Sequence, residues 1–136
     1  MKAKVFDPLR RMEVPLTPEE QVRQWFIGIL LEHSKVPRSL MNSEVAFNLG
    51  GKQYRADILI WDRNARPLAL VECKQPSVTL NREVLDQAIC YDLALNLSWI
   101  ILTNGKKTIV LRKNDGKFVN VNFIPDYETM VQESDE

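Results

Sequence analysis

The stretch Pro67-Leu68-Ala69-Leu70-Val71-Glu72-Cys73-Lys74 decides how this chain is interpreted. It begins as an apolar run and ends on a carboxylate, a small residue and a lysine. A short apolar run bounded by turn residues predicts a buried strand. Alternation along that strand puts Glu72 and Lys74 on one face and Cys73 on the other. Because buried charge is costly unless it is paired or bound to metal, this end of the strand needs a partner.

A candidate partner lies upstream, where residues 53–61 also have the composition of a strand and Asp57 interrupts its apolar half. Residues 64–67 form a loop short enough for a hairpin between the two strands. If these strands pair, Asp57 and Glu72 converge on one side of the sheet. Two carboxylates that share a site repel each other, and a hard divalent cation between them relieves that repulsion. The two strands therefore predict a cation site.

The composition is that of an ordered globular protein with one core, since 45% of the 136 residues are hydrophobic and 26% are charged. His33 is the only histidine, and Cys73 and Cys90 are the only cysteines. These counts exclude a structural zinc site and argue against histidine-based catalysis. The formal net charge is zero, which gives no general attraction for nucleic acid. A local basic rim or a partner subunit could still hold such a substrate.

No apolar run approaches membrane-spanning length, and no signal peptide is visible. The sequence therefore predicts a cytoplasmic protein without a membrane partner. In a reducing compartment the two cysteines are expected to be free thiols.

The order of elements predicts an α/β fold with a mixed central sheet flanked by helices. A helix is expected to begin at the Thr17 cap, with Pro18 in its first turn, and to end before Pro37. A second helix is expected over residues 82–95. Strands are expected at 43–49, 53–61 and 67–74 as an antiparallel meander, at 98–103 as a parallel crossover strand, and at 108–112 and 117–121. We expect one domain over 1–136, with a core at about 15–125, an extended lead-in at 1–14 and a fraying acidic tail at 128–136.

Several charged residues have two interpretations at this stage. Glu20 either completes a capping box at the start of the first helix or points toward the cation site. Glu44 is expected to face solvent at the start of its strand. The pair Arg10–Arg11 is either a solvated surface segment or a phosphate contact. A basic patch is expected, in the first instance as a solvated strand edge, at Lys106, Lys107, Arg112 and Lys113.

Asp57 followed by Glu72-Cys73-Lys74 resembles the active-site pattern of the PD-(D/E)xK nucleases, the restriction-endonuclease-like superfamily. The pair Gln87 and Tyr91 resembles a Gln-x-x-x-Tyr motif that some branches carry on the next helix. Further pieces resemble the N-terminal nuclease domain of type I restriction enzyme R subunits: residues 70–78, 86–88 and 102–105. The resemblance spans roughly residues 15–112, and an ordered set of pieces is more specific than a lone Glu-x-Lys. The superfamily motif's leading proline is absent here, since Ala56 precedes Asp57.

The resemblance implies a restriction-endonuclease-like core and Mg²⁺-dependent hydrolysis of phosphodiester bonds, with DNA as the expected substrate and Mn²⁺ as a substitute ion. The ligands that it implies are Asp57, Glu72, the backbone carbonyl of Cys73 and, as in some members, the first-helix glutamate Glu20. Lys74 would orient or deprotonate the attacking water and steady developing negative charge. Gln87 and Tyr91 would place the nucleic-acid backbone or support the Lys74 strand.

Two alternatives stay open. The chain could be a binding or assembly module that keeps the nuclease fold without cleaving, since its net charge is zero and it lacks the Gly-x-x-x-x-Gly-Lys-Ser/Thr loop of a translocase. It would then be a fragment or a free-standing relative. Alternatively, Glu72 and Lys74 form a salt-bridged sheet edge and Asp57 is a turn residue. Restriction-system subunits are expected partners, and the fold also allows a homodimer.

Overall fold

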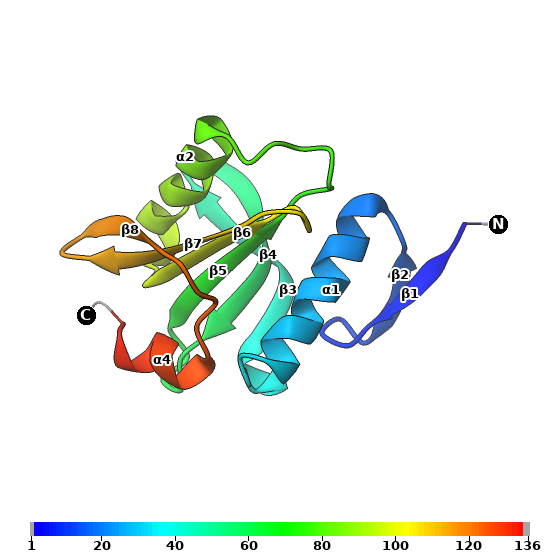
Figure 1. Ribbon diagram of the computed structural model, residues 1–136, viewed down its shortest axis with the longest axis horizontal. Helices are drawn as coiled ribbons and strands as arrows, with labels where there is room; N and C mark the ends of the chain where they lie inside the picture. Colours follow the sequence, from blue (N-terminus) through cyan, green and yellow to red (C-terminus); the bar gives the residue numbers. More distant parts are fainter. Residues whose placement is uncertain (1, 135–136) are drawn as a thin grey trace.

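The strand that carries Glu72 lies near the middle of a six-stranded sheet in the computed structural model, which describes residues 2–134. The sheet has the order β3-β4-β5-β6-β7-β8, in which only β5 and β6 pair in parallel (Figure 1). Its strands are β3 (Met41–Leu49), β4 (Lys52–Trp61), β5 (Pro67–Cys73), β6 (Trp99–Thr103), β7 (Thr108–Asn114) and β8 (Lys117–Val121). The predicted meander followed by a parallel crossover strand is confirmed.

The turns of the sheet form where the sequence supplies residues that tolerate positive φ. Gly50 and Gly51 join β3 to β4 with φ of 59° and 78°. Asp115 and Gly116 join β7 to β8 with φ of 54° and 75°. Two successive positive φ values match the right-handed twist of the flanking strands, so both hairpins close tightly.

Two hydrophobic layers cover the sheet, one on each face. Helices α1 (Pro18–Glu32) and α4 (Tyr127–Gln132) pack on one face, where they enclose Ile58, Val71 and Trp99. Helices α2 (Arg82–Cys90) and α3 (Asp92–Leu95) cover the other face with Leu59 and Leu70 beneath them. Because β5 is buried on both faces, its sequence is a continuous apolar run and not an alternating one.

The two ends of the chain differ from the expectations. The lead-in forms a hairpin of β1 (Lys4–Asp7) and β2 (Met12–Pro15), which lies on the side of α1 away from the sheet (Figure 1). Residues of the expected fraying tail form α4, in which Met130 is completely buried. Helix α4 docks because Trp99 Nε1 donates to the Met130 carbonyl at 3.1 Å. The last two residues of the expected tail, 135 and 136, lie outside the described residues.

Smaller differences concern the helices. The predicted helix over 82–95 is divided at Tyr91 into α2 and α3, and Asn96 ends α3 in the left-handed conformation with φ of 53°. Helix α1 ends at Glu32, and a short 3₁₀ turn, η1 (Arg38–Leu40), leads into β3. Among residues 2–134, no helix is long and apolar enough to cross a membrane.

Candidate cation site and nuclease-like centre

Asp57 lies where β4 and β5 separate. The paired register of these strands runs as far as Ile58 opposite Val71 and stops there. Beyond this pair, the Asp57 carboxylate replaces a backbone acceptor of the ladder: its Oδ2 accepts a hydrogen bond of 2.7 Å from the backbone N–H of Cys73. Asp57 is 9% exposed, so this carboxylate is fixed at the end of the ladder with little contact with bulk water.

Glu72 lies on β5 opposite the position of Asp57 and is 7% exposed. Its Oε1 is buried and has no hydrogen-bond partner among residues 2–134. Burial raises the pKa of Glu72 well above its ordinary value, and the nearby Asp57 charge raises this pKa further. The Asp57 and Glu72 carboxyl groups therefore lie close enough to interact electrostatically.

Lys74 follows directly after β5. Its backbone N–H donates to the Thr103 carbonyl at 2.9 Å, so the parallel pairing with β6 continues to this residue. The Lys74 charge opposes the effect of burial by lowering the pKa of Glu72, which places the amine within electrostatic reach of the carboxylates. Lys74 is half-buried, and it lines a small pocket together with Glu72.

Gln87 and Tyr91 line the same pocket from α2. Gln87 Nε2 donates a hydrogen bond of 3.2 Å to the Tyr91 hydroxyl, so the predicted proximity of these side chains is observed. The Tyr91 ring packs against the rings of Phe47 and Tyr54 at 5.0 and 5.4 Å between centroids. Burial and the Glu72 charge raise the pKa of Tyr91, which therefore stays a neutral hydrogen-bonding group near the carboxylates.

The structure places Glu20 elsewhere, and neither interpretation of its side chain fits. Its Oε1 accepts from Arg10 Nη2 at 2.8 Å and its Oε2 accepts from Gln24 Nε2 at 3.0 Å. Thr17 caps the helix, but the Glu20 carboxylate faces arginine and glutamine donors and not the Thr17 backbone. Both oxygens are already engaged, which argues against Glu20 as a cation ligand.

Glu19 is the helix carboxylate that the sequence argument missed. Burial raises the pKa of Glu19, the Asp57 charge raises it further, and the charges of Arg23 and Lys74 lower it. The Glu19 charge also contributes to raising the pKa of Glu72. Residues 19 and 20 are about 100° apart around a helix, so their side chains point in different directions. No sequence signal separated Glu19 from Glu20, because both residues precede Arg23 by about one helical turn.

The sequence analysis also did not identify Arg23, which contacts the backbone of the site from helix α1. Its Nη1 donates to the Ser43 hydroxyl at 3.1 Å and to the Asp57 carbonyl at 3.4 Å. The same guanidinium lies 2.7 Å from Glu44 Oε1, so Glu44 is a partner of Arg23 and not the solvent-facing residue that was expected. Arg23 Nε lies 3.2 Å from Glu20 Oε2 without hydrogen-bond geometry. These contacts fix the backbone of Asp57 relative to α1.

Cys73 contributes only backbone atoms to this region. Its side chain points to the opposite face, where it is buried in the layer beneath α1. Burial raises the pKa of the Cys73 thiol well above its ordinary value, which keeps it protonated. Its N–H binds Asp57, while the role of its carbonyl as a cation ligand stays a prediction.

The donor set suits a hard divalent cation. Oxygen ligands from carboxylates are what Mg²⁺ and Mn²⁺ prefer. The side chains of residues 2–134 form no ready-made group of three or more acidic, histidine or cysteine ligands. However, a buried carboxylate oxygen without a partner beside a second carboxylate is costly, and a cation would remove that cost. Asp57 and Glu72 therefore fit such an ion, with Glu19 as an additional negative charge.

The fold and the carboxylate pair define an α/β domain with a candidate cation site between two central strands. A family model described as type I restriction enzyme R protein N terminus matches residues 18–125, and the chain belongs to this family. The resemblance to R-subunit N-terminal domains that the motifs predicted is thus confirmed.

A solved structure has the same fold: a fragment of a putative HsdR subunit of a type I restriction enzyme from Vibrio vulnificus YJ016. The TM-score is 0.68 and the sequence identity is 21%, and the match covers 87% of this chain. It covers 25% of that structure's chain, so the present chain corresponds to about a quarter of that relative. The comparison with curated proteins found no match.

Proposed function

We propose that this domain is a metal-dependent nuclease that hydrolyses phosphodiester bonds of DNA. The observation that supports this most directly is the buried pair of carboxylates, in which Glu72 Oε1 has no partner among residues 2–134, beside Lys74. A salt-bridged sheet edge does not account for this arrangement, because no ion pair of Lys74 is present in the described part of the chain. The family membership supports the same conclusion.

Each residue of the site has a role in this proposal. Asp57 and Glu72 would hold Mg²⁺ or Mn²⁺, which supplies a Lewis acid at the scissile phosphate when bound. Lys74 would orient the attacking water and stabilise negative charge that develops on the phosphate oxygens. The Gln87 amide and the Tyr91 hydroxyl would bind a neighbouring phosphate or sugar oxygen, since both are hydrogen-bonding groups on the wall of the same pocket. The ordinary position of such a domain would be within a restriction system, beside other subunits.

Incubation of supercoiled and linear DNA with Mg²⁺ or Mn²⁺ tests this function. We expect nicking by the wild-type chain and a loss of about 100-fold or more in Lys74→Ala, the usual effect of removing a group that acts on transition-state charge. Lys117→Ala is the matched control, because this exposed lysine lies at the far turn between β7 and β8. Full Mg²⁺-dependent nicking by a folded Lys74→Ala protein would exclude the proposed chemistry.

A non-cleaving nucleic-acid-binding or assembly module is the second candidate, and the zero net charge favours it, since strong autonomous binding of DNA is not expected. Calorimetric titration with Mg²⁺ of the wild type and of Asp57→Asn separates the two. Heat of binding that depends on Asp57 supports the nuclease. Absence of Asp57-dependent binding, together with absence of nicking, supports the module.

A further inference from the structure

The turn that follows β6 is built around one buried amide. Asn104 is 7% exposed, and its Oδ1 accepts the backbone N–H groups of Lys106 and Lys107 at 2.9 and 2.8 Å. Its Nδ2 donates to the Val78 carbonyl at 2.8 Å. The amide thus ties the turn to the loop that leads away from Lys74. The positions of both lysine backbones are therefore fixed relative to the candidate site.

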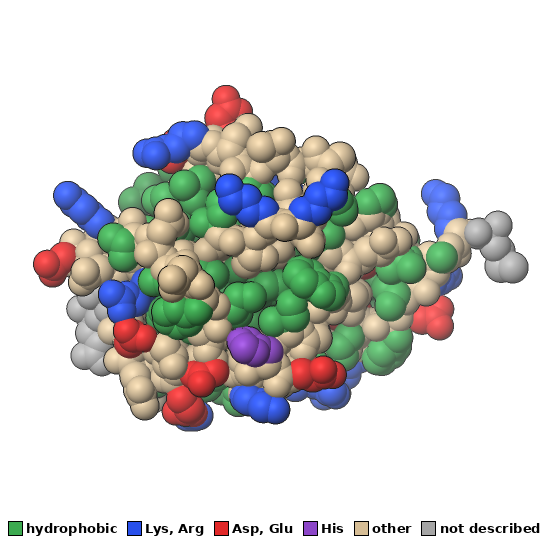
Figure 2. All heavy atoms as spheres, in the orientation of Figure 1, with side chains coloured by type: hydrophobic (Ala, Val, Ile, Leu, Met, Phe, Trp, Pro, Cys, Tyr) green, Lys and Arg blue, Asp and Glu red, His purple; other side chains and the backbone are tan. Residues whose placement is uncertain are grey.

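The charges on this turn are uncompensated, unlike those of the rest of the predicted basic patch. Arg112 pairs with Glu133, and Lys113 Nζ lies 2.8 Å from Asp92 Oδ1. By contrast, the side chains of Lys106 and Lys107 are exposed and have no ion pair within residues 2–134. Figure 2 shows that Lys and Arg side chains are scattered over this face of the molecule and do not form one strongly basic surface. Two adjacent free cations are therefore a local feature.

This turn lies at the same edge of the sheet as Lys74. Parallel β5 and β6 end at one edge, and antiparallel β7 begins there. The Lys74 backbone is hydrogen bonded to Thr103, the residue before Asn104. Neighbouring strands are about 4.8 Å apart, so the start of β7 lies about 10 Å from the end of β5. That separation places the lysines close enough to contact the same bound strand as Lys74.

A groove continues from the turn toward β8. Its lining combines polar residues with an apolar part: Lys107, Thr108, Asn120 and Asn122, and Leu85, Ile109, Val110, Val121 and Phe123. The Phe123 side chain is 48% exposed, so its ring is open to a ligand in the groove. Cations that bind phosphates, beside an exposed aromatic ring and amide groups, are the combination that proteins use to bind single-stranded nucleic acids. The unpaired charges of Lys106 and Lys107 at one end of the groove favour an anionic occupant, and the apolar lining can accept its bases.

We propose that this sheet edge is the track for one nucleic-acid strand next to the active centre. Lys106 and Lys107 bind consecutive phosphates, and an unpaired base stacks on Phe123. This inference deepens the proposed function, on which it rests for the position of the reacting phosphate. It also predicts that a substrate with a single-stranded segment is bound more tightly than a fully paired one.

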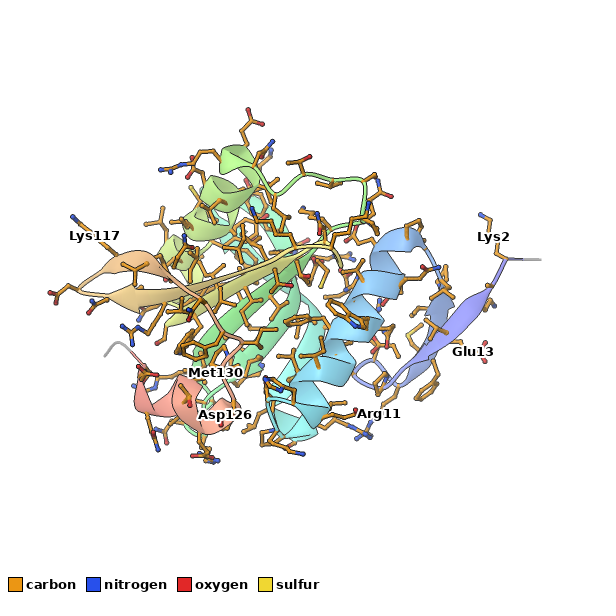
Figure 3. The ribbon with its side chains drawn as sticks, viewed as in Figure 1. Lys2, Arg11, Glu13, Lys117, Asp126 and Met130 are labelled. Carbon is orange, nitrogen blue, oxygen red and sulfur yellow. The ribbon has the colours of Figure 1, made fainter. Side chains whose placement is uncertain are left out.

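Fluorescence anisotropy of a labelled single-stranded oligothymidylate in EDTA measures this binding without cleavage. Each lost phosphate contact reduces the slope of log K against log salt by about 0.7 for single strands. We therefore expect the Lys106→Ala, Lys107→Ala double variant to lower the magnitude of the slope by about 1.4. The control removes two charges elsewhere, at Lys2 and Lys117, which project from opposite ends of the molecule (Figure 3). This control should keep the wild-type slope.

Phe123→Ala tests the stacking contact separately. We expect about 5-fold weaker binding or more with an unchanged salt slope, the low end of the effect of one base–aromatic stack. Leu93→Ala is the matched control, because Leu93 is an exposed apolar residue, 81% exposed, on α3. Circular dichroism of all variants checks that they are folded.

The outcomes separate the track from the nuclease function. Equal affinity and slope in the lysine double variant and its control, or no measurable binding by the wild type at low salt, would overturn the track. Lys74-dependent nicking could persist in that case. Conversely, the lysine double variant could show the expected change in salt slope while the wild type does not nick DNA. That result would support binding of a nucleic-acid strand at this sheet edge and would exclude the proposed nuclease function.

Discussion

Glu72 combines two properties that oppose each other in the metal-free protein. It is an acid that must lose its proton to bind a cation, and it is buried beside Asp57, which raises its pKa. A group whose pKa is raised in the folded state stabilises that state fully only below its unfolded pKa. Its contribution is lost as pH rises through the folded value. The metal-free protein should therefore lose stability above about pH 4.5, the region of an ordinary glutamate.

Glu72→Gln removes this titration. We expect the metal-free variant to be more stable than the wild type at pH 7, by on the order of 1 kcal/mol for each unit by which the pKa is raised. The difference should shrink toward pH 4. Urea unfolding in EDTA at several pH values measures it. Mg²⁺ should stabilise the wild type increasingly as pH rises and should not stabilise the variant. A pH-independent difference between the two proteins would contradict the assignment.

At the scale of elements, Arg23 joins α1 to β3 and β4. Its guanidinium contacts Ser43, Glu44 and the Asp57 carbonyl, and Glu20 lies beside it. Opposing charges hold the pKa of Arg23 above its ordinary value, against the effect of burial. This cross-link explains why the start of α1 has a fixed position next to the strand that carries Asp57. Helix α1 is apolar on several sides, so its apolar residues alone would allow it to pack in other rotations about its own axis.

Arg23→Ala should therefore destabilise the protein by about 3–5 kcal/mol, because it leaves the Glu20 and Glu44 carboxylates without their buried cation. Denaturant midpoints report this loss. Arg82→Ala is the control, since the pair of Arg82 with Asp86 is exposed and should not shift the midpoint measurably. A midpoint of the Arg23 variant equal to that of the control would show that the cluster does not position α1.

At the scale of the whole molecule, the two faces of the sheet differ in the side chains that they carry. One face is covered by α1 and α4 and holds the larger apolar layer. The other face, under α2 and α3, holds the pocket with Glu72, Lys74 and Tyr91. The chain therefore closes its core on one side with α4, which comes from the end of the sequence, and leaves room for polar groups on the other.

Met130→Ala tests whether α4 is part of the core. Met130 is fully buried among residues of the α1 face, so its truncation should cost about 2–5 kcal/mol. Thermal unfolding should show this as a clear fall of the midpoint. Glu128→Ala on the same helix changes an exposed side chain and should leave the midpoint nearly unchanged. If α4 frayed, the Met130→Ala and Glu128→Ala variants would instead unfold at the same temperature.

Local sequence patterns predicted most of the fold, because strands, turns and caps depend on nearby residues. The buried run at β5, the glycine turn at Gly50–Gly51, the Thr17 cap and the order of the six strands all follow from short-range signals. The convergence of Asp57 and Glu72 could also be predicted, since alternation and a short hairpin fix which face each residue takes. The hairpin at the N terminus was missed although its pairing is local, and α4 could not be predicted because it is stabilised by contacts with distant residues.

The sequence by itself determined the sheet, the carboxylate pair with Lys74, and the family pattern. Only the tertiary structure decided that the Glu20 carboxylate is engaged by Arg10 and Gln24, since the rotation of α1 is fixed by the contacts of Arg23 with other elements. It also decided which lysines remain unpaired, because the partners of Arg112 and Lys113 come from α3 and from the segment after α4. Such choices depend on side chains that are remote in the sequence and meet only when the chain folds.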